Sequence, residues 1–434
     1  MNDCNPTYMS LSSSTFVDAD NPHQSLQSQS ELTDTESRSE TDEAESDLGA
    51  CTILQSDDVC TDSREESVCT ETQKTTGSHW SSHMQPKAEG DLRIYSQLEC
   101  GCEVMVCQFN NDGSLLAVGL SNGTIKVYNT DTSGLVQTLR DSESLLSSLP
   151  VTALRFTLSS KSHSLLLATY ASGSVRCWYI WGHECLWTVR EVVESSSQGE
   201  PKQEPRQTLS LSISSSGEKA AAGGSDSAIH LYDMETQQRL STCSASFSRT
   251  LMDGHRLRVF AVTFHPEKEN EFISGGWDNT IHFWDTRQQH SVRMLSGPHI
   301  CGDSLHIDPV TNQILSGSWR KEKALEIWEY SSGQKICEVP EDPHGQSRVY
   351  TCDWLGQDYI VAGGSQPNML RLIDRRTLMS VSRVLGLPSA IFSSSNSPRG
   401  KCAGLIAVTS ESRVFLLDSS SHLARKQNFH CEEK

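Results

Sequence analysis

One stretch of the chain, residues 274–287 (SGGWDNTIHFWDTR), most constrains what the chain can fold into. Two glycines and the polar pair Asp278 and Asn279 separate two short apolar runs, and this composition is typical of a turn that closes a hairpin. In the second run, Ile281 and Phe283 alternate with polar residues, the period-two pattern of a half-buried strand. The stretch therefore predicts a strand, a tight turn and a second strand that ends in Trp-Asp.

Related strand-turn-strand units recur along the chain. Seven units end at residues 129, 179, 233, 285, 329, 374 and 418, which are 44 to 54 residues apart. A period of about 40–45 residues, lengthened by loop insertions, is typical of four-stranded propeller blades. The last unit lacks an outer strand, and a spare strand pattern at 91–98 precedes the first unit. We expect an all-β, seven-bladed β-propeller over residues 91–420, closed by that spare strand, because closure removes exposed sheet edges.

The two ends of the chain differ in composition from this middle part. Residues 1–90 contain 18 Asp+Glu and 4 Lys+Arg, so they carry −14 of the formal net charge of −19. They are rich in Ser and Thr and poor in aliphatic residues, so they cannot bury enough apolar surface to offset the entropy of ordering. We expect residues 1–90 to be a disordered acidic tail and residues 421–434 a short polar tail.

Composition also disfavours several classes of partner. The predicted folded part is close to neutral, whereas phosphate binding needs a basic surface, so we expect no nucleic-acid partner. The first residues lack the basic and apolar regions of a signal peptide, and no apolar run approaches the roughly 20 residues that span a bilayer. We expect no membrane partner and an intracellular protein of the cytoplasm, the nucleus or both. The 15 scattered cysteines are then small core residues in a reducing compartment.

The repeated units resemble WD40 repeats, and the fourth unit carries the family's pattern most fully. It has Gly-His at 254–255, then Ser274, Asp278 and Trp-Asp at 284–285. The resemblance implies that the side chains of His255, Ser274, Asp278 and Trp284 form a hydrogen-bond chain that locks the blade. A buried network of this kind rigidifies a sheet when all of its members are satisfied. The other units depart from the pattern: Asn122, Ser172, Arg320 and Glu411 replace Asp278, and the third unit keeps an Asp without the Ser.

No catalytic constellation stands out from the sequence. Glycine pairs lie at strand ends and not before helices, and no Gly-x-Ser-x-Gly elbow is present. His255 and Asp278 are two members of a triad by type, but a blade-locking network buries the Ser and offers no oxyanion site. The pair Cys100 and Cys102 lacks further ligands at metal-binding spacing. We expect no enzyme, no metal site and no cofactor.

Function is therefore expected on the surface of the propeller, where loops on a rigid scaffold carry binding residues. In WD40 proteins the residue before the turn Asp points to the top face, which here implies Trp277 and, in the fifth unit, Trp319. Two matching inner strands start with Arg258 and Arg348 and add the rings of Phe260 and Tyr350. Trp and Arg are enriched in binding hot spots, so this cluster suits an acidic or aromatic peptide. The alternative is that the rings fill gaps between blades, because aromatic side chains bury large areas in any core.

A second surface motif follows the strand ends. Trp-Asp-Thr-Arg at 284–287, with Asp285 and Arg287, and a partial copy with Asp374 and Arg376 resemble the Trp-Asp-x-Arg signature of propellers that dock on the adaptor of cullin-4-type ubiquitin ligases. The resemblance implies that the Arg side chains point from the bottom face. The alternative is that Arg287 pairs with a local carboxylate.

Two hypotheses follow. The first is a non-enzymatic WD40 scaffold that binds a protein or peptide on its top face. The second is a substrate receptor of a cullin-4-type ligase, which contacts the adaptor through Asp285, Arg287, Asp374 and Arg376.

Overall fold

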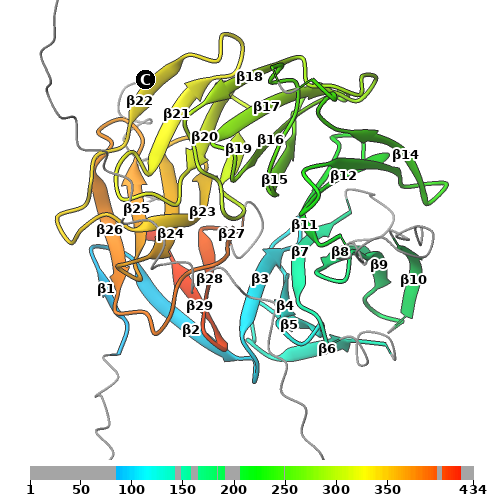
Figure 1. The fold of residues 1–434 in the computed structure, drawn as a ribbon. Helices are drawn as coiled ribbons and strands as arrows, with labels where there is room; N and C mark the ends of the chain where they lie inside the picture. Colours follow the sequence, from blue (N-terminus) through cyan, green and yellow to red (C-terminus); the bar gives the residue numbers. More distant parts are fainter. Residues whose placement is uncertain are drawn as a thin grey trace, which may run out of the picture. The chain divides into compact units, whose positions relative to one another are not determined.

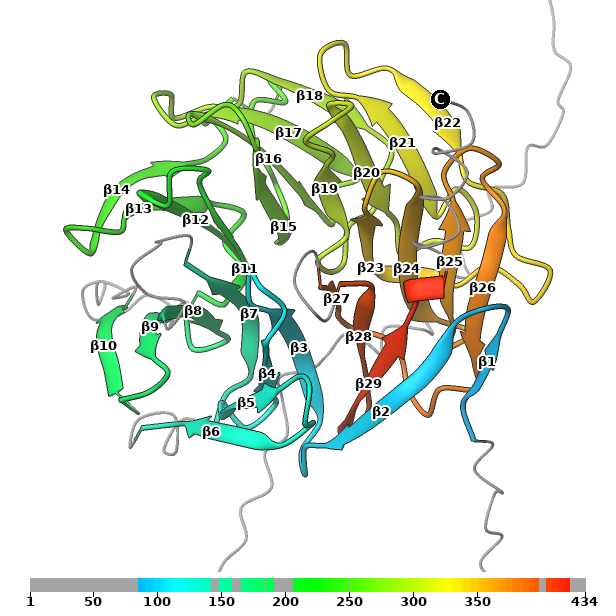
Figure 2. The ribbon, with the colours of Figure 1, turned by 180° about the vertical axis from the view of Figure 1, so that it is seen from behind.

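The computed structural model describes residues 85–141, 148–157, 165–182, 184–190, 206–248, 250–397 and 403–421. The described residues form a seven-bladed all-β propeller (Figures 1 and 2). Blades one to three are β3 (Val104–Phe109), β4 (Leu115–Leu120), β5 (Ile125–Asn129) and β6 (Leu135–Leu139); β7 (Val151–Phe156), β8 (Leu165–Tyr170), β9 (Val175–Tyr179) and β10 (Glu184–Val189); and β11 (Thr208–Ile213), β12 (Lys219–Gly224), β13 (Ile229–Asp233) and β14 (Gln238–Cys243).

Blades four to six continue in chain order. They are β15 (Val259–Phe264), β16 (Glu271–Gly276), β17 (Thr280–Asp285) and β18 (Arg293–Ser296); β19 (Leu305–Ile307), β20 (Gln313–Gly317), β21 (Leu325–Glu329) and β22 (Lys335–Glu338); and β23 (Arg348–Leu355), β24 (Tyr359–Ser365), β25 (Leu370–Asp374) and β26 (Ser380–Leu385). Every pairing between these neighbours is antiparallel, as expected for strands joined by short turns.

Blade seven combines the two ends of the propeller. It consists of β27 (Ser394–Asn396), β28 (Leu405–Ser410), β29 (Arg413–Asp418) and, as its outer strand, β2 (Arg93–Glu99). Leu98 of β2 pairs with Val414 of β29, so a strand from before the first blade closes the ring. The predicted closure is confirmed, and Figure 2 shows β2 beside β29.

One more strand lies before the predicted start of the propeller. β1 (Lys87–Glu89) pairs with the outer edge of β26 and makes blade six five-stranded. The boundary at residue 90 is therefore wrong for residues 87–89, whose three-residue strand is too short to leave a periodic pattern. The rest of the predicted acidic tail, residues 1–84, lies outside the described residues, as do residues 422–434.

The sheets are buried on both faces because each blade packs between two others. Apolar clusters combine residues of neighbouring blades: one joins Val106 and Ile125 of blade one to Leu154 and Trp178 of blade two. All six residues of β17 are buried, so the prediction of a half-buried strand there is wrong. Ile281 and Phe283 pack against blade five, whereas Thr280 and His282 lie on the opposite face of β17, where they bond to Asp278 and Ser291 and not to solvent. A buried polar face of this kind needs such internal partners.

Polar side chains also join the inner strands of adjacent blades. Ser212 Oγ accepts a hydrogen bond from the Phe264 amide at 3.0 Å, and Thr263 Oγ1 donates to the Leu305 carbonyl at 2.6 Å. The Phe109 amide donates to Ser395 Oγ at 3.0 Å across the closing junction. Because these bonds run between blades and not within them, they fix the ring of inner strands. Among the described residues, no helix is long and apolar enough to cross a membrane.

Candidate functional site

The polar network of blade four has the geometry that the sequence resemblance implies. His255 Nδ1 lies 2.9 Å from Asp278 Oδ2, and His255 Nε2 lies 2.7 Å from Ser274 Oγ. Trp284 Nε1 donates to the same hydroxyl at 2.7 Å. Asp278 also accepts from the Arg256 amide and from the Thr280 hydroxyl. The chain of bonds joins the loop before β15 to the β16–β17 turn, so it orients that turn and the Trp277 side chain beside it.

Electrostatics agree with a structural role for this network. Burial alone would raise the pKa of Asp278, but the hydrogen bond and charge of His255, with the Arg256 amide and Thr280, outweigh it and hold that pKa well below its ordinary value. His282 lies beside His255, with ring centroids 4.5 Å apart. Burial, followed by the charge of His255, lowers the pKa of His282 to about 3. The blade therefore holds an ionised carboxylate next to a neutral imidazole at physiological pH.

On the top face, defined as the end of the propeller that carries the β16–β17 and β20–β21 turns, Trp277 lies within an aromatic stack. Its ring is partly exposed, packs on Phe260 with centroids 5.2 Å apart, and stacks on His299 at 6.4 Å. The guanidinium of Arg258 lies 5.7 Å from the centre of the Trp277 ring. Three of these side chains belong to blade four, whereas His299 comes from the loop that leads to blade five.

A second stack repeats this arrangement on blades five and six. The Arg348 guanidinium lies 4.4 Å from the centre of the Trp319 ring, which is also partly exposed. The Tyr350 ring lies tilted beside Trp319 and packs edge-on against Phe392. Tyr350 is only 5% exposed, so its ring fills the gap between blades, supports Trp319 and presents little surface to a partner. His299 and Phe392 were missed from sequence because both lie in loops between blades and belong to no repeated strand pattern.

Two of the top-face arginines, Arg258 and Arg320, are held by neutral groups. Arg258 donates to Gln207 Oε1 at 2.7 Å, and Arg320, which follows Trp319, donates to Asn279 Oδ1 at 2.9 Å. Within the described ranges, neither of these two guanidinium groups forms an ion pair. Their positive charge is therefore not compensated locally, and a partner with carboxylates would compensate it.

The predicted bottom-face arginines differ from each other in their contacts. Arg287 forms an ion pair with Asp285 while 73% of its side chain stays exposed. In the partial copy, the Arg376 amide donates to Asp374 Oδ1 and the residue is exposed. The neighbouring Arg375 turns inward to Asp308 of blade five at 2.6 Å. The local pairing expected for Arg287 is thus present, and its exposed guanidinium remains available to a partner.

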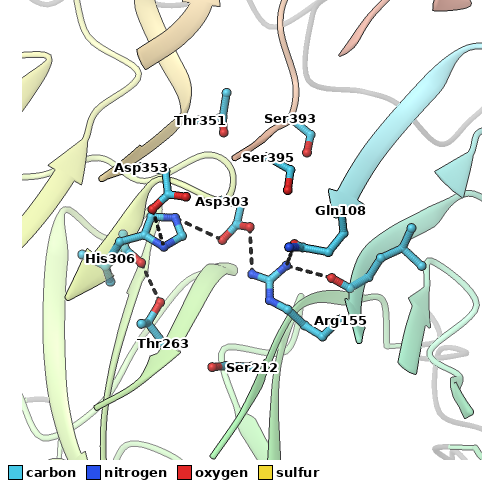
Figure 3. Close-up of polar contacts among 12 residues, drawn as sticks. Gln108, Arg155, Ser212, Thr263, Asp303, His306, Thr351, Asp353, Ser393 and Ser395 are labelled. Atoms are coloured by element: carbon cyan, nitrogen blue, oxygen red, sulfur yellow. Dashed lines mark hydrogen bonds and ion pairs between the residues drawn. The ribbon is translucent and has the colours of Figure 1, made fainter. Parts of the chain in front are cut away.

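A further polar cluster lies among the inner strands, and sequence analysis missed it. Figure 3 shows Arg155 of β7 reaching Asp303, with His306 between Asp303 and Asp353. Arg155 Nη2 lies 2.8 Å from Asp303 Oδ2 and joins blade two to the loop before β19. Burial would raise the pKa of Asp303, but the Arg155 charge lowers it, whereas burial raises the pKa of Asp353. The cluster therefore contains one close ion pair, between Arg155 and Asp303. The second carboxyl, that of Asp353, lies 3.8 Å from the imidazole of His306.

Comparison with known proteins agrees with this geometry. The family model of the WD40 repeat (WD domain, G-beta repeat) matches residues 94–129 and 242–285, and the second match contains the complete blade-four network. This chain is a WD40-repeat protein. The WD repeat-containing protein slp1 of Schizosaccharomyces pombe is 23% identical to it over 272 residues, which cover 60% of this chain and 48% of slp1.

This WD40 protein is also similar to proteins of other kinds. Dynein axonemal intermediate chain 4 of Homo sapiens is 27% identical over 239 residues, covering 50% of this chain and 27% of the relative. The chain thus spans half or less of the length of these curated relatives. A chain in a crystal structure of the Mitotic Checkpoint Complex superposes with a TM-score of 0.61 at 14% identity, covering 82% of this chain and 99% of that one, which shows the fold alone.

Proposed function

We propose that this WD40 protein is a non-enzymatic scaffold that binds a protein partner with its top face. The observation that carries the proposal is the pair of partly exposed Trp rings, each with a guanidinium over it. Trp and Arg at the centre of a rigid surface are the residues that most often dominate binding energy. Relatives include a protein described as a cofactor of the APC complex and a dynein intermediate chain, which supports a role in protein assembly without favouring one partner.

The partner segment that fits this surface combines carboxylates with an apolar or aromatic side chain. Arg258 and Arg320 are held by neutral acceptors, so an Asp or Glu of the partner would gain charge-assisted hydrogen bonds. The partly exposed Trp277 ring, which stacks on both Phe260 and His299, offers an apolar contact beside Arg258. An acidic peptide with an aromatic or aliphatic anchor matches both features.

The double substitution Trp277→Ala with Trp319→Ala is expected to lower partner recovery at least about tenfold, because such anchors each contribute about 2 kcal/mol or more. The measurement is proximity labelling with mass spectrometry, followed by co-purification of the proteins enriched by the wild type. The matched control is Trp181→Ala, which removes another exposed Trp, at the β9–β10 turn. Equal recovery by the double variant and the wild type would contradict the proposal, and a large fall in its melting temperature would mark the rings as core.

A second candidate function is a substrate receptor of a cullin-4-type ligase. The observation that favours it is the 73% exposure of the Arg287 side chain directly after the third strand of the best-conforming WD40 blade. The Asp285 carboxylate fixes the direction of that guanidinium by two hydrogen bonds. Such an ordered, exposed guanidinium can donate to an acceptor on another protein with little further loss of side-chain entropy.

If the receptor hypothesis is correct, Arg287→Ala with Arg376→Ala abolishes co-purification of the ligase adaptor. Arg413→Ala is the control, since it removes a partly exposed arginine of blade seven that pairs with Glu99. Adaptor recovery that is unchanged in the double variant, or absent already in the wild type, rejects the receptor hypothesis and leaves the scaffold proposal intact.

A further inference from the structure

In several blades, the third-strand residue at one register position near the start of that strand is buried and polar, and in blades two, five and six it lies near a side chain of opposite charge. Arg176 pairs with Asp141 at 2.7 Å, Glu326 with Lys335 at 3.0 Å, and Arg371 lies 3.7 Å from Asp342. In blade four this residue is His282, which is fully buried. Its nearest ring is another imidazole, that of His255, instead of an opposite charge.

His282 is only half satisfied. Its Nδ1 lies 2.8 Å from Ser291 Oγ, whereas its buried Nε2 has no hydrogen-bond partner. A buried polar atom without a partner costs about 1–3 kcal/mol and needs an explanation. An Nδ1–H that donates to Ser291 leaves the lone pair of Nε2 free, which is the state in which an imidazole binds a metal ion.

We propose that His255, Asp278 and His282 form a binding site for a divalent transition-metal ion of the zinc class. One donor atom from each residue lies within 4.8 Å of the other two, and this is the one such group of three among the described residues. Two imidazoles and a carboxylate are a donor set that zinc accepts, with water in the fourth position. Zinc bonds of about 2.0–2.1 Å place the donors of a tetrahedral site roughly 3.4 Å apart. The 2.9 Å contact between His255 Nδ1 and Asp278 Oδ2 must therefore open slightly, while donors up to 4.8 Å apart must move closer.

The surrounding groups already orient these donors as the outer partners of metal ligands do. Ser291 holds the far nitrogen of His282, Ser274 holds Nε2 of His255, and Thr280 holds one oxygen of Asp278. Metal binding at Nδ1 of His255 moves its proton to Nε2, and Ser274 then accepts that hydrogen bond instead of donating it. The ion thus replaces the direct contact between His255 and Asp278 while the remaining bonds of the network persist.

Blade three provides a natural contrast. His230 and Asp226 occupy the same positions of the strand and turn as His282 and Asp278, with His230 Nε2 3.8 Å from Asp226 Oδ2. There the third member is the buried guanidinium of Arg206, which lies 2.9 Å from Asp226. A fixed positive charge in that place repels a metal ion, so we infer that the site is specific to blade four.

The test uses the full chain stripped with EDTA and then titrated with Zn²⁺, with bound metal measured by elemental analysis after desalting, and with Co²⁺ as the spectroscopic probe. The wild type is expected to retain roughly one zinc ion that His282→Leu does not retain. Co²⁺ at this site should give visible d–d bands without the thiolate charge-transfer band of a cysteine site. His230→Leu is the matched control and should bind as the wild type does.

His282→Leu replaces a half-satisfied imidazole with an apolar side chain, so it is expected to fold, and circular dichroism checks this. His282→Asn provides a second variant should the Leu variant unfold. Failure of the wild type to retain zinc overturns the proposal, and so does equal zinc retention by the wild type and a folded His282 variant. Neither outcome bears on the proposal that the top face binds a protein partner, because that surface consists of other side chains.

Discussion

Asp278→Ala is expected to lower the free energy of unfolding by about 3–5 kcal/mol, the usual loss when one member of a buried, paired polar group is removed. The side chain of Asp278 is 7% exposed and that of His255 is fully buried. Removal of the carboxylate leaves His255 Nδ1, the Arg256 amide and the Thr280 hydroxyl without their acceptor. Chemical denaturation of the full chain measures the loss.

The matched control for this prediction is Asn122→Ala. Asn122 occupies the equivalent turn of blade one, but it is exposed, and its side chain contacts only Cys102 Sγ and the Thr124 amide among the described residues. The control is expected to lose less than about 1 kcal/mol, as exposed substitutions usually do. Similar losses for the two variants would contradict the assignment of Asp278 to a structural network.

Asp342→Ala is expected to destabilise the protein by a similar amount, about 3–5 kcal/mol, because it removes a buried carboxylate from the side chains of Arg371, Arg383 and His344. The Asp342 side chain is fully buried and lies 3.0 Å from Arg383 Nη2 and 3.0 Å from His344 Nδ1. Arg371, itself 3% exposed, lies 3.7 Å away. Glu341→Ala is the control, since it removes a neighbouring carboxylate that is exposed.

The loss at Asp342 should also depend on pH. Burial would raise the pKa of Asp342, but hydrogen bonds from Ser380, His344 and Arg383 outweigh it, so its folded-state pKa lies well below that of the unfolded chain. A depressed carboxyl pKa stabilises the folded state fully above about pH 4 and loses this contribution as the pH falls through the folded value. Denaturation between about pH 5 and pH 2 should therefore show a steeper loss for the wild type than for Asp342→Asn. Parallel curves would contradict the assignment.

The blade-four network could be predicted because the fourth unit resembles the WD40 repeat in all four members, and that resemblance implies the hydrogen-bond chain. The closing strand could also be predicted, because the last unit lacks an outer strand and the strand pattern at 91–98 has no blade of its own. Pairing the two completes blade seven, as β2 and β29 do. Periodicity was misleading for β17, where Thr280 and His282 alternate with apolar residues but face a neighbouring blade instead of water. Alternation alone cannot distinguish these two environments, because both place polar side chains on one face of the strand.

Long-range contacts were beyond sequence reasoning. Arg155 and Asp303 are separated by 148 positions and meet only because the ring closes around them. The burial of Tyr350 depends on Phe392, which comes from the loop leading to the next blade. Phe260 and Tyr350 occupy matching positions of two similar inner strands, yet Phe260 is partly exposed and Tyr350 is buried. This difference in burial arises from the packing of the neighbouring blades, which the strand sequences do not contain.

We propose that the blade-four network holds the fold while the two Trp-Arg stacks bind a partner. Partner recovery and melting temperature, measured together for Trp277→Ala with Trp319→Ala and for Trp181→Ala, test it most directly. The double variant is expected to lose partner recovery by about tenfold or more while it stays folded, and Trp181→Ala is expected to match the wild type in both. Full recovery by the double variant, or equal losses in both variants, would contradict the claim.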